Sequence, residues 1–180
     1  MKFKELQDLL KKDRERWHNE KKWFSKLISS EYKLVYLLRW CSFLSSNRLL
    51  FPIFIVIWCR YKSLAKKSGC DINIHTKIGG GFRIYHINGI VINDKASIGE
   101  NCTIRTGCVI GENHNGVPII GDNVNFGVHC LIIGNIKINN GAVIGAGAIV
   151  THDVPENGVV YGQSAIVRNY KNCSVDAIVY

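Results

Sequence analysis

The sequence lacks the cysteine spacings that mark zinc sites and disulfide frameworks, because none of its seven cysteines forms a C-x-x-C pair. It also lacks a long apolar run. The longest stretch, residues 49–59, spans eleven residues and contains Pro52, whereas a helix that crosses a bilayer needs about 20. No apolar stretch follows a basic start, so no signal peptide is expected. These absences predict a cytoplasmic protein with reduced thiols and no bound metal.

Acidic residues are scarce in the first third of the chain. Residues 1–67 hold 16 Lys and Arg against 6 Asp and Glu, a net charge of +10, whereas residues 68–180 hold 7 against 8, a net charge of −1. The basic character therefore belongs to the N-terminal segment. One interpretation is that this segment makes peripheral contact with the anionic inner face of a membrane, or with an acidic lipid-linked glycan. The other is a helical cap on the rest of the chain, and no nucleic-acid partner is expected.

A six-residue repeat begins at residue 72. Large apolar residues return at thirteen positions, as Ile72, Ile78, Ile84, Ile92, Ile98, Ile104, Ile110, Ile120, Phe126, Ile132, Ile138, Ile144 and Val150. A period of six fits neither a 3.6-residue helix nor simple strand alternation. It fits a solenoid with three walls, in which each short strand sends one side chain inward. The repeat predicts a mainly β protein, a left-handed parallel β-helix with an N-terminal α-helical segment.

Two further patterns agree with this register. Mostly small residues stand two positions before the repeat residue and are expected to face inward, at Ala96, Cys102, Cys108, Val124, Cys130, Ile136, Ala142 and Ala148. Corners need residues that tolerate unusual dihedral angles, and we assign that role to the Gly and Asn residues at 79, 93, 99, 111, 121, 127, 139 and 145.

The N-terminal segment is expected to be helical. Its apolar stripes comprise Phe3, Leu6, Leu9 and Leu10, then Trp23, Phe24, Leu27 and Ile28, then Tyr32, Val35, Tyr36 and Phe43. A further helix is predicted from about Pro52 to Lys67, ending at Gly69. We expect three parts: a helical segment at 1–68, a β-helix at 69–167 and a tail at 168–180.

Two of the six histidines stand where the repeat is interrupted. His86 lies in a two-residue insertion between Ile84 and Ile92, and His114 in a longer interruption between Ile110 and Ile120. Because insertions in a solenoid leave the wall as loops, they are where sites are built. The other histidines are expected at the surface.

Residues 71–167 resemble the hexapeptide-repeat acyltransferases of the serine O-acetyltransferase branch. The matching stretches are DINIH at 71–75, KIGGG at 77–81, IYHINGIVI at 84–92, IGNI at 133–136, IGAGA at 144–148, VP at 154–155 and GQSA at 162–165. The resemblance implies acetyl transfer from acetyl-CoA to a hydroxyl group. His86 would be the general base and Asp71, fifteen residues earlier, would orient its imidazole.

The acceptor site departs from that of serine acetyltransferases. Tyr85 stands where they carry a substrate-binding Asp, and Gly116 and Val117 stand where they carry an Arg-His pair whose Arg holds the serine carboxylate. The sequence is similar in these respects to the O-acetyltransferases of capsule, O-antigen and colanic acid assembly. We therefore expect a sugar hydroxyl as acceptor, with serine as the alternative. The expected acceptor-binding residues are Tyr85, Asn88, Asp94 and His114.

The resemblance also implies a homotrimer with CoA in a groove between subunits. Gly111, Gly127, Val128 and Ala146 would contact CoA, and Arg168 or Lys171 would replace a missing phosphate-binding Arg. Three other classes stay open. One is a β-helix zinc enzyme of the γ-carbonic anhydrase kind using His86, His114 and His129; the others are N-acyl transfer to an amino sugar and a non-catalytic scaffold.

Overall fold

The computed structural model describes residues 1–18 and 29–162. Within these residues, three helices come first, α1 (Phe3–His18), α3 (Ser30–Leu44) and α4 (Phe51–Lys67), with a short 3₁₀ turn at Arg48–Leu50 before α4. The stripe predicted at Trp23–Ile28 lies outside the described residues. Helix α3 begins where the Ser29 side chain accepts a hydrogen bond from the backbone N–H of Tyr32, and α4 has Pro52 in its first turn.

Fourteen short strands follow in the described part of the chain, which ends at residue 162. They are β1 (Asp71–Ile72), β2 (Lys77–Ile78), β3 (Arg83–Tyr85), β4 (Val91–Ile92), β5 (Ser97–Ile98), β6 (Thr103–Arg105), β7 (Val109–Gly111), β8 (Ile119–Ile120), β9 (Asn125–Phe126), β10 (Leu131–Ile133), β11 (Lys137–Ile138), β12 (Val143–Ile144), β13 (Ile149–Val150) and β14 (Val159–Val160).

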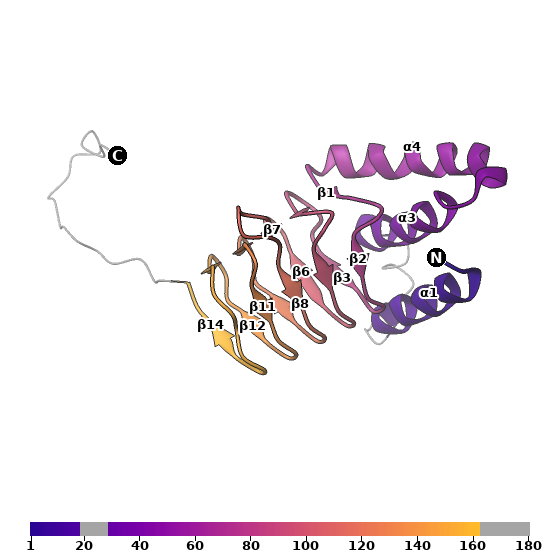
Figure 1. Cartoon of the computed structure of the whole chain (residues 1–180). Helices are drawn as coiled ribbons and strands as arrows, with labels where there is room; N and C mark the ends of the chain where they lie inside the picture. Colours follow the sequence, from indigo (N-terminus) through magenta and orange to yellow (C-terminus); the bar gives the residue numbers. More distant parts are fainter. Residues whose placement is uncertain (19–28, 163–180) are drawn as a thin grey trace, which may run out of the picture.

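The strands form three parallel sheets that wind as one left-handed β-helix. We name them wall A (β1-β4-β7-β10-β13), wall B (β2-β5-β8-β11) and wall C (β3-β6-β9-β12-β14). From β1 to β13, successive strands of the chain visit A, B and C in turn, so each coil closes a triangle. In the last coil, the single bridge between Val154 and Ile138 stands in place of a wall B strand before β14 joins wall C. Figure 1 shows the coils stacked along one axis, with the helices at the end where β1–β3 lie. The predicted fold class is confirmed.

The repeat residues occupy the interior as predicted. All thirteen are buried, and so are the eight positions that precede them by two. Equivalent residues stack in register across coils, for example Ile72 on Ile92 and Ile92 on Ile110. Each buried isoleucine contributes about 1.5–3 kcal/mol relative to exposure, so the stack is a continuous apolar core.

Unusual dihedral angles do not explain the glycines at the predicted corners, so that prediction is wrong. None of the eight predicted corner residues has a positive φ; the left-handed positions are elsewhere, at glycines such as Gly81, Gly107 and Gly147. Glycine is required at position 79 because a Cβ there would lie 2.5 Å from the carbonyl carbon of Gly99 in the next coil, and a Cβ at Gly127 would lie 2.5 Å from the Ala146 nitrogen. The constraint is the close approach of stacked backbones.

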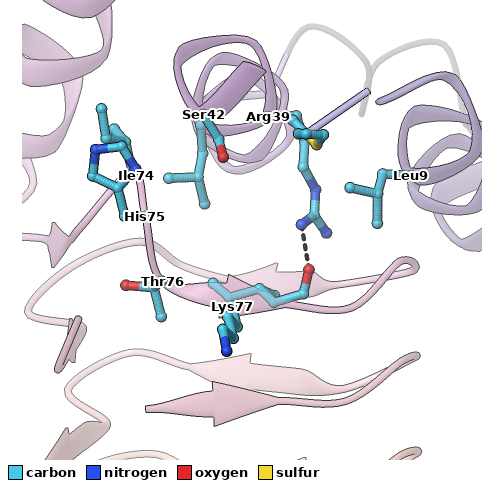
Figure 2. A pocket seen from close by; sticks show the side chains of 10 residues that line it. Leu9, Arg39, Ser42, Ile74, His75, Thr76 and Lys77 are labelled. Carbon is cyan, nitrogen blue, oxygen red and sulfur yellow. Dashed lines mark hydrogen bonds between the residues drawn. The ribbon is translucent and has the colours of Figure 1, made fainter. Parts of the chain in front are cut away.

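A buried ion pair attaches the helices to the first coil. Arg39 of α3 donates from Nε and Nη2 to the two carboxylate oxygens of Asp13 of α1. Its Nη1 donates to the backbone carbonyl of Ile78, and Nη2 also donates to that of Gly79. Asp13 also accepts from the backbone N–H of Phe82 at 3.1 Å. Both side chains are almost fully buried. One guanidinium group thus joins two helices to wall B, as Figure 2 shows for the Arg39–Ile78 bond.

We expect Arg39→Ala to lower the free energy of unfolding by about 3–5 kcal/mol, because it leaves the Asp13 carboxylate buried without its cation. Urea unfolding followed by circular dichroism measures this. Lys95→Ala is the control, since Lys95 pairs with Glu112 at an exposed site and such pairs contribute less than about 1 kcal/mol. Equal, small losses in the two variants would contradict the role given to Arg39.

Candidate active site

The two-residue insertion lies at the corner between walls C and A. Tyr85 pairs with Arg105, and Val91 pairs with Val109. Five residues lie between Tyr85 and Val91 but only three between Arg105 and Val109, so the coil that contains Tyr85 has two more residues at this corner. They are His86 and Ile87, because the next residue, Asn88, pairs normally: its carbonyl accepts from the backbone N–H of Gly107 at 2.9 Å. Ile87 is buried, whereas His86 is exposed and has a φ of 60°. Burial of Ile87 thus anchors the insertion and leaves the His86 imidazole at the surface.

Asp71 starts near the same corner. Its backbone N–H donates to the carbonyl of Ile90, and the N–H of Gly89 donates to the carbonyl of Ser68, so the segment entering β1 runs beside the segment leaving the insertion. The Asp71 side chain is exposed on the outer face of wall A, opposite the buried Ile72. Within the described residues, no hydrogen bond joins Asp71 to His86.

A shallow depression on wall A holds several other predicted residues. It has a volume of about 290 Å³ and is lined by Asp71, Asp94 and Gly111, together with Asn73, Val91, Ile92, Asn93 and Ile110. The structure therefore brings together one residue predicted for catalysis, one for the acceptor and one for CoA. Two carboxylates and two asparagine side chains give the depression a polar character.

The Tyr85 ring lies near two cations that sequence reasoning missed. The guanidinium carbon of Arg83 lies 4.3 Å from the centre of the Tyr85 ring, and that of Arg105 lies 5.3 Å from it. Burial lowers the pKa of Arg83. Arg105 is half-buried and donates to the carbonyl of Phe126. The sequence showed that Arg83 and Tyr85 share the outer face of one strand, because they lie on either side of the inward Ile84. It did not show that Arg105 is the neighbour of Tyr85 in the next coil, because the insertion makes the distance between them twenty residues and not the regular eighteen.

His114 lies at a different corner. The interruption between Ile110 and Ile120 is four residues longer than a normal repeat and joins wall A to wall B. Asn113 and Gly116 exchange backbone hydrogen bonds of 3.0 and 3.1 Å, which makes a compact turn with His114 exposed at its tip. Wall A separates this turn from the His86 corner. Within one chain, the two histidines predicted for the site are not brought together.

Three of the predicted CoA residues stack above the insertion. The corner between walls C and A carries Asn88, Thr106, Val128 and Ala146 in successive coils, linked by backbone hydrogen bonds of 2.9 Å from Gly107 to Asn88, His129 to Thr106 and Gly147 to Val128. We call these four residues, together with the residue that follows each of them (Gly89, Gly107, His129 and Gly147), the C–A corner column. Val128 and Ala146 are exposed there, and Gly127 immediately precedes Val128. Arg168 and Lys171 lie outside the described residues.

The buried cysteines offer little nucleophilic chemistry. Burial raises the pKa of Cys41 and Cys102 to about 11 and that of Cys70 to about 12, so these thiols are protonated near neutral pH. Cys108 and Cys130 face each other inside the core with their sulfurs 3.0 Å apart. In the described part of the chain no group of three His, Cys, Asp or Glu residues could hold a metal ion.

A second hollow lies between the helices and the first coil. Its volume is about 180 Å³, and it is lined by residues that include Leu9, Arg39, Ser42, His75 and Lys77 (Figure 2). The Arg39 guanidinium there is already engaged by Asp13 and two carbonyls. We therefore interpret the hollow as a gap in the packing between the helices and the β-helix, not as a binding site.

Comparison with known proteins agrees with this geometry. No family model matches the chain. It is 39% identical over 101 residues to serine acetyltransferase 4 of Arabidopsis thaliana, covering 54% of this chain and 28% of that protein. It is 36% identical over 106 residues to WcaB of Escherichia coli K12, named as a colanic acid biosynthesis acetyltransferase, covering 57% of this chain and 65% of that one. The chain thus spans less than two thirds of the length of these relatives.

Solved structures give the same picture. Serine acetyltransferase isoform 3 of Entamoeba histolytica, solved with cysteine, superposes with a TM-score of 0.77 at 23% identity, over 94% of this chain and 62% of that one. The soybean serine acetyltransferase solved with serine gives 0.74 at 27% identity, over 89% and 68%.

Proposed function

From the confirmed resemblance to the hexapeptide-repeat acyltransferases, we propose that this chain transfers an acetyl group from acetyl-CoA to a hydroxyl group, with His86 as the general base. The observation that carries the proposal is the place of His86. It is exposed in the insertion that starts the C–A corner column, and the column continues through Val128 and Ala146, where CoA is expected. An acyl-CoA that lies along the column would therefore place its acyl end at the His86 imidazole.

The reaction needs one base and no metal. The His86 imidazole takes the proton of the acceptor hydroxyl as that oxygen attacks the thioester carbonyl carbon. When the tetrahedral intermediate collapses, the carbon–sulfur bond breaks and the CoA sulfur receives the proton from the imidazolium. The products are an acetyl ester and free CoA thiol. Asp71, at the start of wall A beside the same corner, is the positioning residue for the imidazole in this proposal.

A homotrimer accounts for the separation of the two histidines. His86 lies at the C–A corner and His114 at the A–B corner of the same chain. In a three-fold assembly the A–B corner of one chain can face the C–A corner of its neighbour, and a site between chains would then contain both. Glu112 and Asn115, which lie in the same loop as His114, would join it at the acceptor side.

The observations disagree about which molecule is the acceptor. The loop at 111–119 contains no Arg, which favours a neutral sugar hydroxyl, and WcaB supports that assignment. The other relatives and the solved structures support serine better. Arg105 adds a reason to test serine first, because its guanidinium group lies beside Tyr85, the residue that precedes the insertion, and a guanidinium can hold a carboxylate.

We also propose that α4 contacts an anionic membrane surface. Phe51, Ile53, Ile55, Val56 and Trp58 are exposed, and residues 51–59 contain no charged side chain. The exposed apolar residues surround the helix on every side except the one facing α3, which suits lipid better than a single protein partner. Arg60, Lys62, Lys66 and Lys67 follow, as in helices that lie in the headgroup region. No helix in the described ranges has the length and apolarity to span a bilayer.

Replacing the base should abolish turnover without abolishing CoA binding. We expect His86→Asn to lower kcat at least 100-fold, because the acceptor proton has no base to receive it. Asn tolerates the left-handed backbone at this position, so the variant should fold. Release of CoA thiol measures turnover, and calorimetry measures CoA binding. His152→Asn, a change at another exposed histidine, is the control; equal activity in both variants would exclude His86 as the base.

Acceptor preference can be measured on the unmodified protein. With acetyl-CoA as donor, we expect L-serine to give a kcat/KM at least tenfold above that of nucleotide sugars or oligosaccharides. If a sugar exceeds serine by that margin, the sugar O-acetyltransferase assignment replaces it. Ester and amide products are distinguished by their lability to hydroxylamine, and an amide product would assign N-acyl transfer. CoA binding with turnover of neither class, or no CoA binding at all, would contradict acetyl transfer.

Vesicle binding tests the proposed membrane surface. We expect the protein to sediment with vesicles rich in phosphatidylglycerol but not with pure phosphatidylcholine, and less so as salt rises. Val56→Glu should weaken sedimentation at least tenfold, whereas Ile149→Glu, at an exposed position of wall A, should leave it unchanged. If Val56→Glu instead dissociates an oligomer and leaves sedimentation intact, the apolar face of α4 belongs to a second copy of the chain.

A further inference from the structure

One residue of the C–A corner column, His129, differs in type from the glycines at the equivalent positions of the other coils. Four successive coils place a residue with left-handed backbone at this corner: Gly89, Gly107, His129 and Gly147, with φ values of 66°, 68°, 53° and 65°. Three are glycines, for which this conformation carries little cost. His129 adopts it with a full side chain, at a cost in conformational free energy that glycine would remove. The fold itself does not require histidine there, since the coils on both sides use glycine.

The His129 side chain points along the corner toward the coil of His86. A Cβ built on Gly107 would lie 2.1 Å from Nδ1 of His129 and 2.4 Å from its Cε1, so the imidazole covers the outer face of Gly107. Gly107 in turn stacks on Gly89, three residues after His86. His129 is exposed, and within the described residues its ring makes no hydrogen bond. The ring therefore stands between the Val128–Ala146 part of the column and the insertion.

Beyond Asn88, which lies in the coil of His86, the side chains of the column leave His129 as the polar group available to a ligand. Val128 and Ala146 carry none, and the Thr106 hydroxyl already donates to the carbonyl of Asn88 at 2.7 Å. An imidazole N–H is a hydrogen-bond donor that suits an amide carbonyl. Adjacent coils are about 4.8 Å apart. Because the His129 ring overlies Gly107, it would meet a ligand about one coil, or roughly 5 Å, before that ligand arrives at the coil of His86.

We propose that His129 binds the pantetheine arm of acyl-CoA, donating a hydrogen bond to one of its amide carbonyls. This inference rests on the proposed function, because it takes the corner column as the path of the donor. His129 is then a binding residue that holds the arm in line with His86, and the backbone cost of a side chain at this corner is offset by affinity for the donor. Its loss should affect donor affinity and leave the proton transfer intact.

The test compares two glycine substitutions at left-handed corners. His129→Gly restores the residue that the other coils of the column carry. Asn123→Gly makes the equivalent change at the corner between walls B and C, where Asn123 has a φ of 59°. Both variants should fold, because glycine adopts this conformation freely, and thermal unfolding checks this. Calorimetry with CoA and steady-state kinetics with acetyl-CoA are the readouts.

We expect His129→Gly to raise the Kd for CoA and the KM for acetyl-CoA at least tenfold, with kcat within about threefold of the unmodified protein. Asn123→Gly should change none of these. A Kd for CoA within threefold of the unmodified value in folded His129→Gly would overturn the inference while leaving acetyl transfer in place. A fall in kcat with unchanged Kd would also overturn it. If the unmodified protein does not bind CoA, the proposed function itself fails.

Discussion

Closure of the chain into a triangle every eighteen residues is the constraint on which the rest of this structure depends. A closed triangular coil has room inside for one large side chain per wall, so every sixth residue must be apolar and of nearly uniform size. Parallel pairing then places equivalent residues of successive coils directly above one another, as in the Ile92–Ile110 pair. The core is therefore a stack with fixed register, and a slip of one residue would turn the whole apolar set outward.

The same constraint decides where a site can form. Wall positions are occupied by ladder hydrogen bonds on both edges and by core residues on the inner face, so added residues are accommodated at corners. The insertion of His86 and Ile87 does this without disturbing the register, because Asn88 resumes the pairing with Gly107. Burial of Ile87 also anchors the extra loop. An exposed imidazole thus sits on a rigid scaffold, which is the arrangement that positions a reacting group precisely.

The helices protect one end of this stack. An open coil end would present unpaired backbone groups to solvent, and here α3 and α1 cover wall B and the start of wall C through Arg39, Asp13 and the N–H of Phe82. The Tyr61 hydroxyl of α4 donates to the carbonyl of Ile72 in wall A in the same way. Each wall of the first coil is therefore held by a polar contact from a helix.

The sequence by itself determined the β-helix, the thirteen inward residues, the small residues between them and the two interruptions, because a period of six is a local property that each uninterrupted window of residues 72–150 displays. Only the tertiary structure decided which corner each interruption occupies, since that depends on counting closed coils. It separated His86 from His114, placed Arg105 against Tyr85, and showed that Gly79 and Gly127 serve close backbone approach. It also aligned His129 with Gly89, Gly107 and Gly147. These relations join residues in different coils, and insertions of unequal length make their spacing irregular along the chain.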